Sequence, residues 1–219
     1  MAKTVGKVGI WNRALDRIGE TEPIEDEDED RMAADVCRRH YDDCLLEVLE
    51  STPWPFATKQ SALTSPTGVT RTGWDYIYTL PTDCAYPLAL LDEDQRIGLM
   101  NADERVPFEI MSDDAGVWRI LCCDVASDEF EVLEYVATPT STASNDTTGG
   151  GINGWPRTFA DAVIWRLAAE LALAIKKDRQ MYIGCMQSYM LSLSNARADQ
   201  FNSKHPDPEP DPPSVAARS

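Results

Sequence analysis

The sequence predicts an α+β fold, in which a helical bundle formed by the N- and C-terminal helices carries an inserted antiparallel β meander. Two observations predict it. Near both ends of the chain, apolar residues recur at spacings of three and four, which is the period of an amphipathic helix. In the middle, short apolar or alternating runs are separated by turn-forming residues, which is typical of antiparallel strands. The length of 219 residues suits one large domain or a core domain with an insertion.

The chain divides into five segments by these patterns. We expect N-terminal helices of the bundle over 1–58, a β-rich insertion over 59–138, a flexible connector over 139–157, a helical pair over 158–203 that completes the bundle, and an extended proline-rich tail over 204–219. The connector is rich in Gly, Ser and Thr, and the tail is rich in Pro and acidic residues. Neither composition supplies the apolar side chains that a packed core needs.

The clearest helical pattern covers Phe159–Ile175, and the rest of the bundle is expected to form around it. Thr158 is the predicted N-cap, Asp161 would favour the positive end of the helix dipole, and the lysine pair 176–177 would favour its negative end. A second apolar run over Met181–Ala196 follows after a short connection, so the two helices should form an antiparallel pair. This pair needs the N-terminal helices to cover its apolar face.

The N-terminal third predicts two helices. The first covers Gly6–Ile18, and Gly19 is placed to end it in a left-handed cap. The second covers Arg31–Glu50 and ends before Pro53 and Pro55, because proline cannot continue a helix.

Between these helices lies an acidic run, ETEPIEDEDED, with eight acidic side chains in eleven residues. No helix face or strand can bury so many carboxylates, so the run is predicted to be a solvated loop. Its last residues, near Asp30, would cap the second helix and favour its positive end.

The middle of the chain predicts an antiparallel meander. One short strand is expected within the Ser, Thr, Pro and Gly-rich stretch 59–73, and five more cover Tyr76–Leu80, Tyr86–Leu91, Val106–Met111, Val117–Cys123 and Phe130–Val136. The separators SDDAG and DVASDE look like hairpin turns. Pro107 cannot donate a ladder hydrogen bond and places its strand at an edge of the sheet.

The charge excludes several classes of function. The formal net charge is −17, with 20 basic and 37 acidic residues, which argues against groove binding to DNA or to an anionic membrane. No apolar run reaches the roughly 18 residues that span a bilayer. The N-terminus lacks the apolar segment of a secretory signal, so we expect synthesis in a cytoplasm and reduced, mostly buried cysteines.

Candidate catalytic and metal-binding chemistry is sparse. Cys37, His40 and Cys44 share one face of the second predicted helix and would offer three soft ligands to a metal ion. The competing interpretation, two core thiols beside a boundary histidine, is favoured because no further Cys/His cluster supplies a fourth ligand. No phosphate-binding glycine loop, zinc-protease motif or nucleophile elbow is present, so the sequence predicts no cofactor and no enzyme activity.

Five sequence segments, in order, resemble a known family. They are NRALDRIGE at 12–20, CRRHY leading to PWPFA at 37–57, YIYTLPTDC at 76–84, WPRTFADA at 155–162 and RLAAELA at 166–172. Together they are similar to the tail tubular protein A family of podophages, the head-to-tail adaptors, over roughly 5–200. The connector is longer and the acidic loop more charged than in that pattern.

The resemblance implies a non-enzymatic virion protein. Such adaptors form a ring of about twelve identical subunits in the neck of the virion, between the portal protein and the tail nozzle or tail tube protein. DNA passes through the channel without specific binding, no membrane is involved, and assembly takes place in the host bacterial cytoplasm.

Two sets of site residues follow from this interpretation. The channel-facing acidic loop would present Glu25, Asp26, Glu27, Asp28, Glu29 and Asp30, whose carboxylates repel passing phosphates. The tail would be an arm that binds the portal or a neighbouring subunit, with His205, Pro206, Pro208, Pro210, Pro212 and Arg218 as its contact residues.

The alternative function is an acidic DNA mimic that binds a basic DNA-processing enzyme. It explains the charge, but not the large helical bundle or the ordered resemblances. A mimic would bind such an enzyme tightly, whereas an adaptor would bind portal rings and ignore it.

Overall fold

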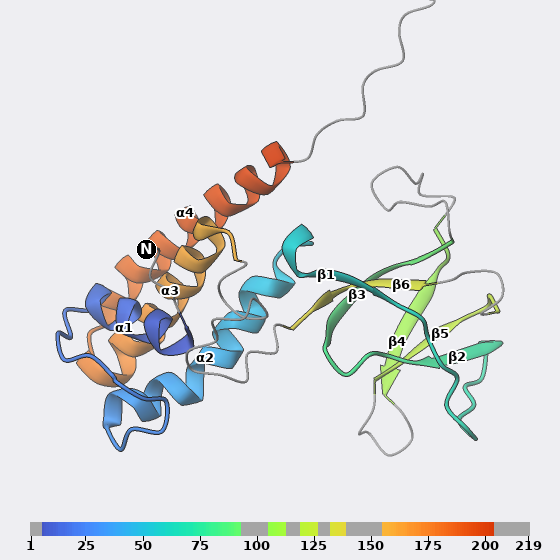
Figure 1. Ribbon diagram of the computed structural model, residues 1–219, viewed down its shortest axis with the longest axis horizontal. Coiled ribbons are helices and arrows are strands. Elements are labelled where there is room, and N and C mark those ends of the chain that lie inside the picture. The colour runs from blue at the N-terminus through green and yellow to red at the C-terminus, as the bar shows by residue number, and fades with distance from the viewer. Residues whose placement is uncertain (1–5, 93–104, 113–118, 127–131, 139–154, 204–219) are drawn as a thin grey trace, which may run out of the picture.

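A computed structural model of the chain describes residues 6–92, 105–112, 119–126, 132–138 and 155–203. A helical unit and a strand unit lie side by side in it (Figure 1). The helices are α1 (Lys7–Arg17), α2 (Met32–Glu50), α3 (Arg157–Leu171) and α4 (Arg179–Ser203). Helices α1 and α2 pack with α3 and α4. The predicted α+β fold, with a helical bundle formed by N- and C-terminal helices, is therefore confirmed.

Helix α3 lies at the centre of the bundle. It contacts α1, α2 and α4, and it is buried along most of its length. The predicted apolar face is buried, with Val163, Ile164, Leu167 and Ala168 all inaccessible to solvent. The sequence pattern therefore identified the correct central element.

The predicted start of α3 is wrong in detail. The helix begins at Arg157 with Pro156 at the N-cap position, no side chain caps it, and no acidic residue lies in its first turn. Thr158 and Asp161 consequently lie within the helix. The Pro156 carbonyl accepts the first helical hydrogen bond, from the Ala160 N–H at 3.1 Å, and the helix does not extend further back because the residue before a proline is disfavoured in the helical conformation.

Helices α3 and α4 are joined by a π-helical turn, Ala172–Lys176. Lys177 ends it in the left-handed conformation, with φ of 53°. A carboxylate oxygen of Asp178 then accepts hydrogen bonds from the backbone N–H groups of Gln180 (2.8 Å) and Met181 (3.1 Å), which satisfies donors in the first turn of α4. The short connection predicted from sequence is confirmed.

The end of α1 follows the predicted left-handed cap. Gly19 has φ of +70°, and its N–H donates to the Asp16 carbonyl while that of Glu20 donates to the Leu15 carbonyl. This pair of bonds is a Schellman motif, which turns the chain sharply into the acidic loop.

Helix α2 begins one residue later than predicted, and Asp30 does not cap it. Arg31 occupies the N-cap position, and no side chain makes a capping hydrogen bond. At the other end the indole N–H of Trp54 donates to the Val48 carbonyl at 2.9 Å. Trp54 is fully buried and meets the ring of Phe159 edge-on at 4.9 Å between centroids, so this turn is fastened to α3.

Six strands form two antiparallel sheets of three. They are β1 (Thr58–Ser61), β2 (Tyr76–Thr79), β3 (Cys84–Leu91), β4 (Phe108–Ser112), β5 (Arg119–Cys123) and β6 (Val132–Ala137). Their orders are β1-β6-β3 and β2-β5-β4.

The strand order corrects the predicted meander. Only β4 and β5 are neighbours both in sequence and in a sheet, so SDDAG joins a hairpin, whereas DVASDE connects two different sheets. The edge position predicted from Pro107 is confirmed, because it directly precedes the edge strand β4.

Strand β6 links the two units. Val136 belongs to the core of the helical bundle, while Leu133, Tyr135 and Ala137 belong to a second core shared with β2 and β5. Alternate side chains of a strand point to opposite faces, so this sheet is covered on both sides. The sheet β1-β6-β3 therefore lies between the bundle and the sheet β2-β5-β4.

The six cysteines are unpaired, and all except Cys84 are buried, as predicted. Within the described ranges, no helix has the length and apolar composition needed to cross a membrane.

Candidate interaction surface: the acidic loop

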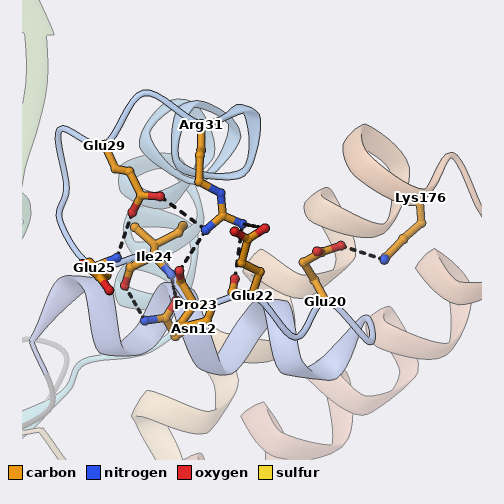
Figure 2. A network of polar contacts seen from close by, with 9 residues as sticks. All are labelled: Asn12, Glu20, Glu22, Pro23, Ile24, Glu25, Glu29, Arg31 and Lys176. Carbon is orange, nitrogen blue, oxygen red and sulfur yellow. Dashed lines mark hydrogen bonds and ion pairs between the residues drawn. The ribbon is translucent and has the colours of Figure 1, made fainter.

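The acidic loop, residues 20–30, is attached to the bundle by one apolar side chain. Ile24 is 1% exposed and belongs to the core of the bundle. Its backbone is fixed from both sides by Asn12 of α1, whose amide donates to the Ile24 carbonyl at 2.9 Å and accepts from the Ile24 N–H at 2.8 Å (Figure 2). The isoleucine therefore fixes the middle of a strongly acidic segment.

Arg31 folds back over the loop from the start of α2. Its guanidinium donates to the Pro23 carbonyl at 2.8 Å and forms ion pairs with Glu22 (3.1 Å) and Glu29 (3.3 Å) (Figure 2). Glu29 also accepts a hydrogen bond from the backbone N–H of Glu25 at 2.8 Å. That backbone bond and Arg31 together hold the pKa of Glu29 below its ordinary value.

Basic residues of the bundle hold the two ends of the loop. Lys176 pairs with Glu20 at 2.8 Å, and this hydrogen bond lowers the pKa of Glu20. Lys7 pairs with Glu27 at 2.6 Å, and Arg38 donates to the carbonyls of Glu27 and Glu29. These contacts connect the loop to α1, to α2 and to the turn after α3.

Four of the eight loop carboxylates are paired and four are not. Within the part of the chain that the structure describes, no basic group lies within ion-pair distance of the Glu25, Asp26, Asp28 or Asp30 carboxylates, and all four side chains are exposed. The prediction of a solvated loop is therefore confirmed, but the loop is held in one conformation. This arrangement presents a fixed patch of negative charge, which repels a polyanion or attracts a cationic surface.

The sequence indicated the charge of this site but not its supports. No sequence pattern assigns Ile24, Asn12 or Arg31 a role in holding the loop. A single isoleucine inside an otherwise polar run was the available signal, because an apolar side chain there has no role in a fully solvated loop.

The candidate metal ligands of α2 are not arranged as a metal site. Cys37 and Cys44 are buried, and burial raises the pKa of each thiol to about 12. Among the described residues, no group of three or more Cys, His, Asp or Glu side chains is placed to hold a metal ion. The favoured interpretation of two core thiols fits this geometry.

The predicted arm lies outside the described residues, with His205, Pro206, Pro208, Pro210, Pro212 and Arg218, and so does most of the connector 139–157. A scan against models of protein families and a search of curated proteins found no match. The function is therefore argued from the chain's own sequence and geometry.

Proposed function

We propose that this protein is a structural head-to-tail adaptor of a bacteriophage. Identical subunits, about twelve, form a ring between the portal protein and the tail nozzle, and DNA passes through it. The observation that carries the proposal is the acidic loop, a fixed patch of unpaired carboxylates on a helical scaffold. The five sequence segments that resemble the podophage adaptors, in the same order, also support the proposal.

Four of the five segments that carry the resemblance contribute residues to the bundle core, whereas YIYTLPTDC contributes Tyr78 and Leu80 to the second core. PWPFA supplies Trp54 and Phe56, and WPRTFADA supplies Trp155 and Phe159. The ring of Phe159 lies 4.9 Å from Trp54, 4.8 Å from Phe56 and 4.9 Å from Trp155. Segments far apart in sequence thus build one aromatic cluster, which is what a shared scaffold requires. The resemblance therefore supports a common framework, on which surface loops perform the function.

The acidic loop is assigned to the wall of the channel. Exposed charges act over a screening length of roughly 8 Å in physiological salt. A ring of carboxylates at the lumen repels the phosphates of a passing duplex at short range and keeps it from adhering. No sequence-specific DNA contact is needed for this role.

The DNA-mimic alternative requires a continuous display of phosphate-like charge. In the loop Glu20, Glu22, Glu27 and Glu29 are engaged by the protein's own basic residues. This internal neutralisation removes half of the carboxylates from such a display and favours the adaptor.

Binding to purified portal rings tests the proposal. The full chain should sediment with portal rings of the same virus and leave a basic DNA-processing enzyme unbound. The reverse preference would contradict the adaptor and support the mimic.

A neutralised loop tests the channel assignment separately. Replacing Glu25, Asp26, Asp28 and Asp30 by their amides should leave portal binding intact and increase retention of DNA in assembled necks. The control replaces two exposed acidic residues of the strand unit by their amides, Asp75→Asn and Glu109→Gln. Equal DNA retention in both variants would remove the loop from the channel wall.

Removing residues 204–219 tests the proposed arm. If this segment binds the portal or a neighbour and becomes ordered only on binding, the truncated chain should assemble poorly on portal rings. Assembly equal to that of the full chain would refute the arm.

A further inference from the structure

The outer face of α4 is apolar and uncharged. Residues 180–196 contain no charged side chain, although 26% of the chain is charged. Ile183, Met190 and Leu191 are 39%, 60% and 65% exposed. Their spacing places them on one stripe of the helix.

The opposite face of α4 already fills the core of the bundle. Its buried residues are Cys185, Tyr189, Leu193 and Ala196, and they pack mainly toward α3. The exposed stripe is therefore not needed to attach α4 to its own subunit. Gln187 and Ser194 lie along the same stripe, so it offers a flat surface of modest polarity. An exposed apolar helix face of this kind marks a surface that another protein covers.

The charges of the helical unit indicate what covers it. Residues 157–203 contain six basic and four acidic side chains, a formal charge of +2, and Lys177 and Arg179 are exposed at the start of α4. Residues 6–50 contain six basic and 14 acidic side chains, a formal charge of −8. Residues 157–203 of one copy are therefore charge-complementary to residues 6–50 of a second copy.

We call the exposed surface of α2 around Met32 and Asp42, next to the acidic loop, the acidic side. This surface also presents an apolar residue. Met32, the first residue of α2, is 61% exposed beside the acidic loop, and the Asp42 side chain farther along α2 is 78% exposed.

Helices α1, α2 and α4 all pack against α3, and the turn before α4 reaches the acidic loop of its own subunit, where Lys176 pairs with Glu20 at 2.8 Å. The stripe of Ile183, Met190 and Leu191 lies farther along α4, on the face opposite its buried residues, so it points away from the core of its own subunit.

We infer that the outer face of α4 in one copy binds the acidic side of the next copy, around Met32 and Asp42. The apolar stripe of α4 supplies the buried area. Lys177 and Arg179 of the same copy lie opposite carboxylates on the acidic side of the next copy. A contact between two different surfaces is heterologous, so it continues from copy to copy until a ring closes. The closure into a ring rests on the proposed function, whereas the pairwise contact does not.

Two variants of the full chain test the contact, each with one surface disabled. Met190→Gln with Leu191→Gln makes the α4 stripe polar without adding charge, and Met32→Lys with Asp42→Lys makes the surface around these two residues of α2 basic. All four positions are exposed, and unchanged thermal melting should show that both variants fold. The matched control is Tyr76→Glu on β2, where the aromatic side chain is 40% exposed.

Particle mass is measured for each protein alone and with portal rings. The wild-type chain and the Tyr76→Glu control should form assemblies larger than a dimer in at least one condition, and each disabled variant should lose at least tenfold in association. An equimolar mixture of the two disabled variants should stop at dimers, because each pair retains one intact contact.

Each remaining outcome overturns the inference. Association of the α4 variant equal to wild type removes α4 from the contact, and a mixture without dimers removes the acidic side as its partner. A wild-type chain that stays monomeric in both conditions overturns it as well. If wild-type copies associate as expected but never bind portal rings, the contact stands and the adaptor function fails. If the α4 variant still forms full rings on portals, the function stands and the contact fails.

Discussion

The acidic loop and the outer face of α4 belong to the same helical unit and are built in opposite ways. The loop carries many charges, yet an isoleucine, an asparagine and several basic side chains fix it in place. The α4 face carries no charge between residues 180 and 196, and its apolar side chains remain exposed. The acidic loop is therefore suited to face solvent, whereas the outer face of α4 is suited to be covered by another protein.

Both surfaces depend on α3, so removing a central aromatic ring of the bundle should have the largest effect. Phe159→Ala would leave a cavity among Trp54, Phe56 and Trp155, and we expect it to lower the free energy of unfolding by about 3–5 kcal/mol. Urea unfolding followed by circular dichroism measures this loss. Tyr76→Ala, which removes an exposed ring, should cost far less; equal losses would mean that the aromatic cluster is not the centre of the fold.

The same substitution, isoleucine to alanine, should have different effects on the two surfaces. Ile24→Ala removes a side chain that is 1% exposed and should cost about 2–4 kcal/mol, and it should increase proteolysis of the loop. Ile183→Ala removes one that is 39% exposed and should cost less than about 1 kcal/mol. Similar losses in urea unfolding would show that Ile24 does not anchor the loop.

The polar support of the loop predicts a smaller effect. Asn12→Ala removes both hydrogen bonds to the Ile24 backbone and leaves its N–H and carbonyl without their partner. We expect a loss of about 1–2 kcal/mol and faster hydrogen exchange at the Ile24 amide. Unchanged exchange at that amide would contradict the assignment. The control Asn195→Ala changes an exposed asparagine on α4 and should have little effect.

The smallest effect is a dependence on pH. The pKa of Glu20 is lowered mainly by its hydrogen bond to Lys176, and that of Glu29 mainly by the Glu25 backbone N–H. Their stabilisation is therefore present above the ordinary glutamate pKa of 4.5 and is lost as the pH falls through the lowered folded-state values. The variant Glu20→Gln with Glu29→Gln should melt slightly lower than wild type at neutral pH, and the difference should shrink as the pH falls below 4.5. A difference that persists at acid pH would contradict the linkage.

The sequence predicted the elements better than their partners. The sequence patterns predict α1 to α4 and the strands β2 to β6, because helix and strand patterns are local, whereas β1 (Thr58–Ser61) lies in a polar stretch with no such pattern. The division into two sheets was not, since the pairing of β6 with β1 and β3 joins residues far apart in the chain. Composition alone likewise indicated a loop at 20–30 but did not reveal that Asn12 and Arg31 hold it.

The outer face of α4 shows the same limit. The run Met181–Ala196 was recognised by the residues of its inner face, which now lie in the core. Ile183, Met190 and Leu191 do not stand out in the sequence, because a helix that is apolar on two faces has no clear period. The absence of charge over residues 180–196 was the signal that would have revealed this face.

The most direct test of the adaptor function is the mass of the particle formed by the full chain, measured alone and after mixing with purified portal rings. Native mass spectrometry of the mixture should find portal rings that carry one closed ring of about twelve copies. Portal rings that remain bare while the folded chain stays in solution would contradict the proposed function.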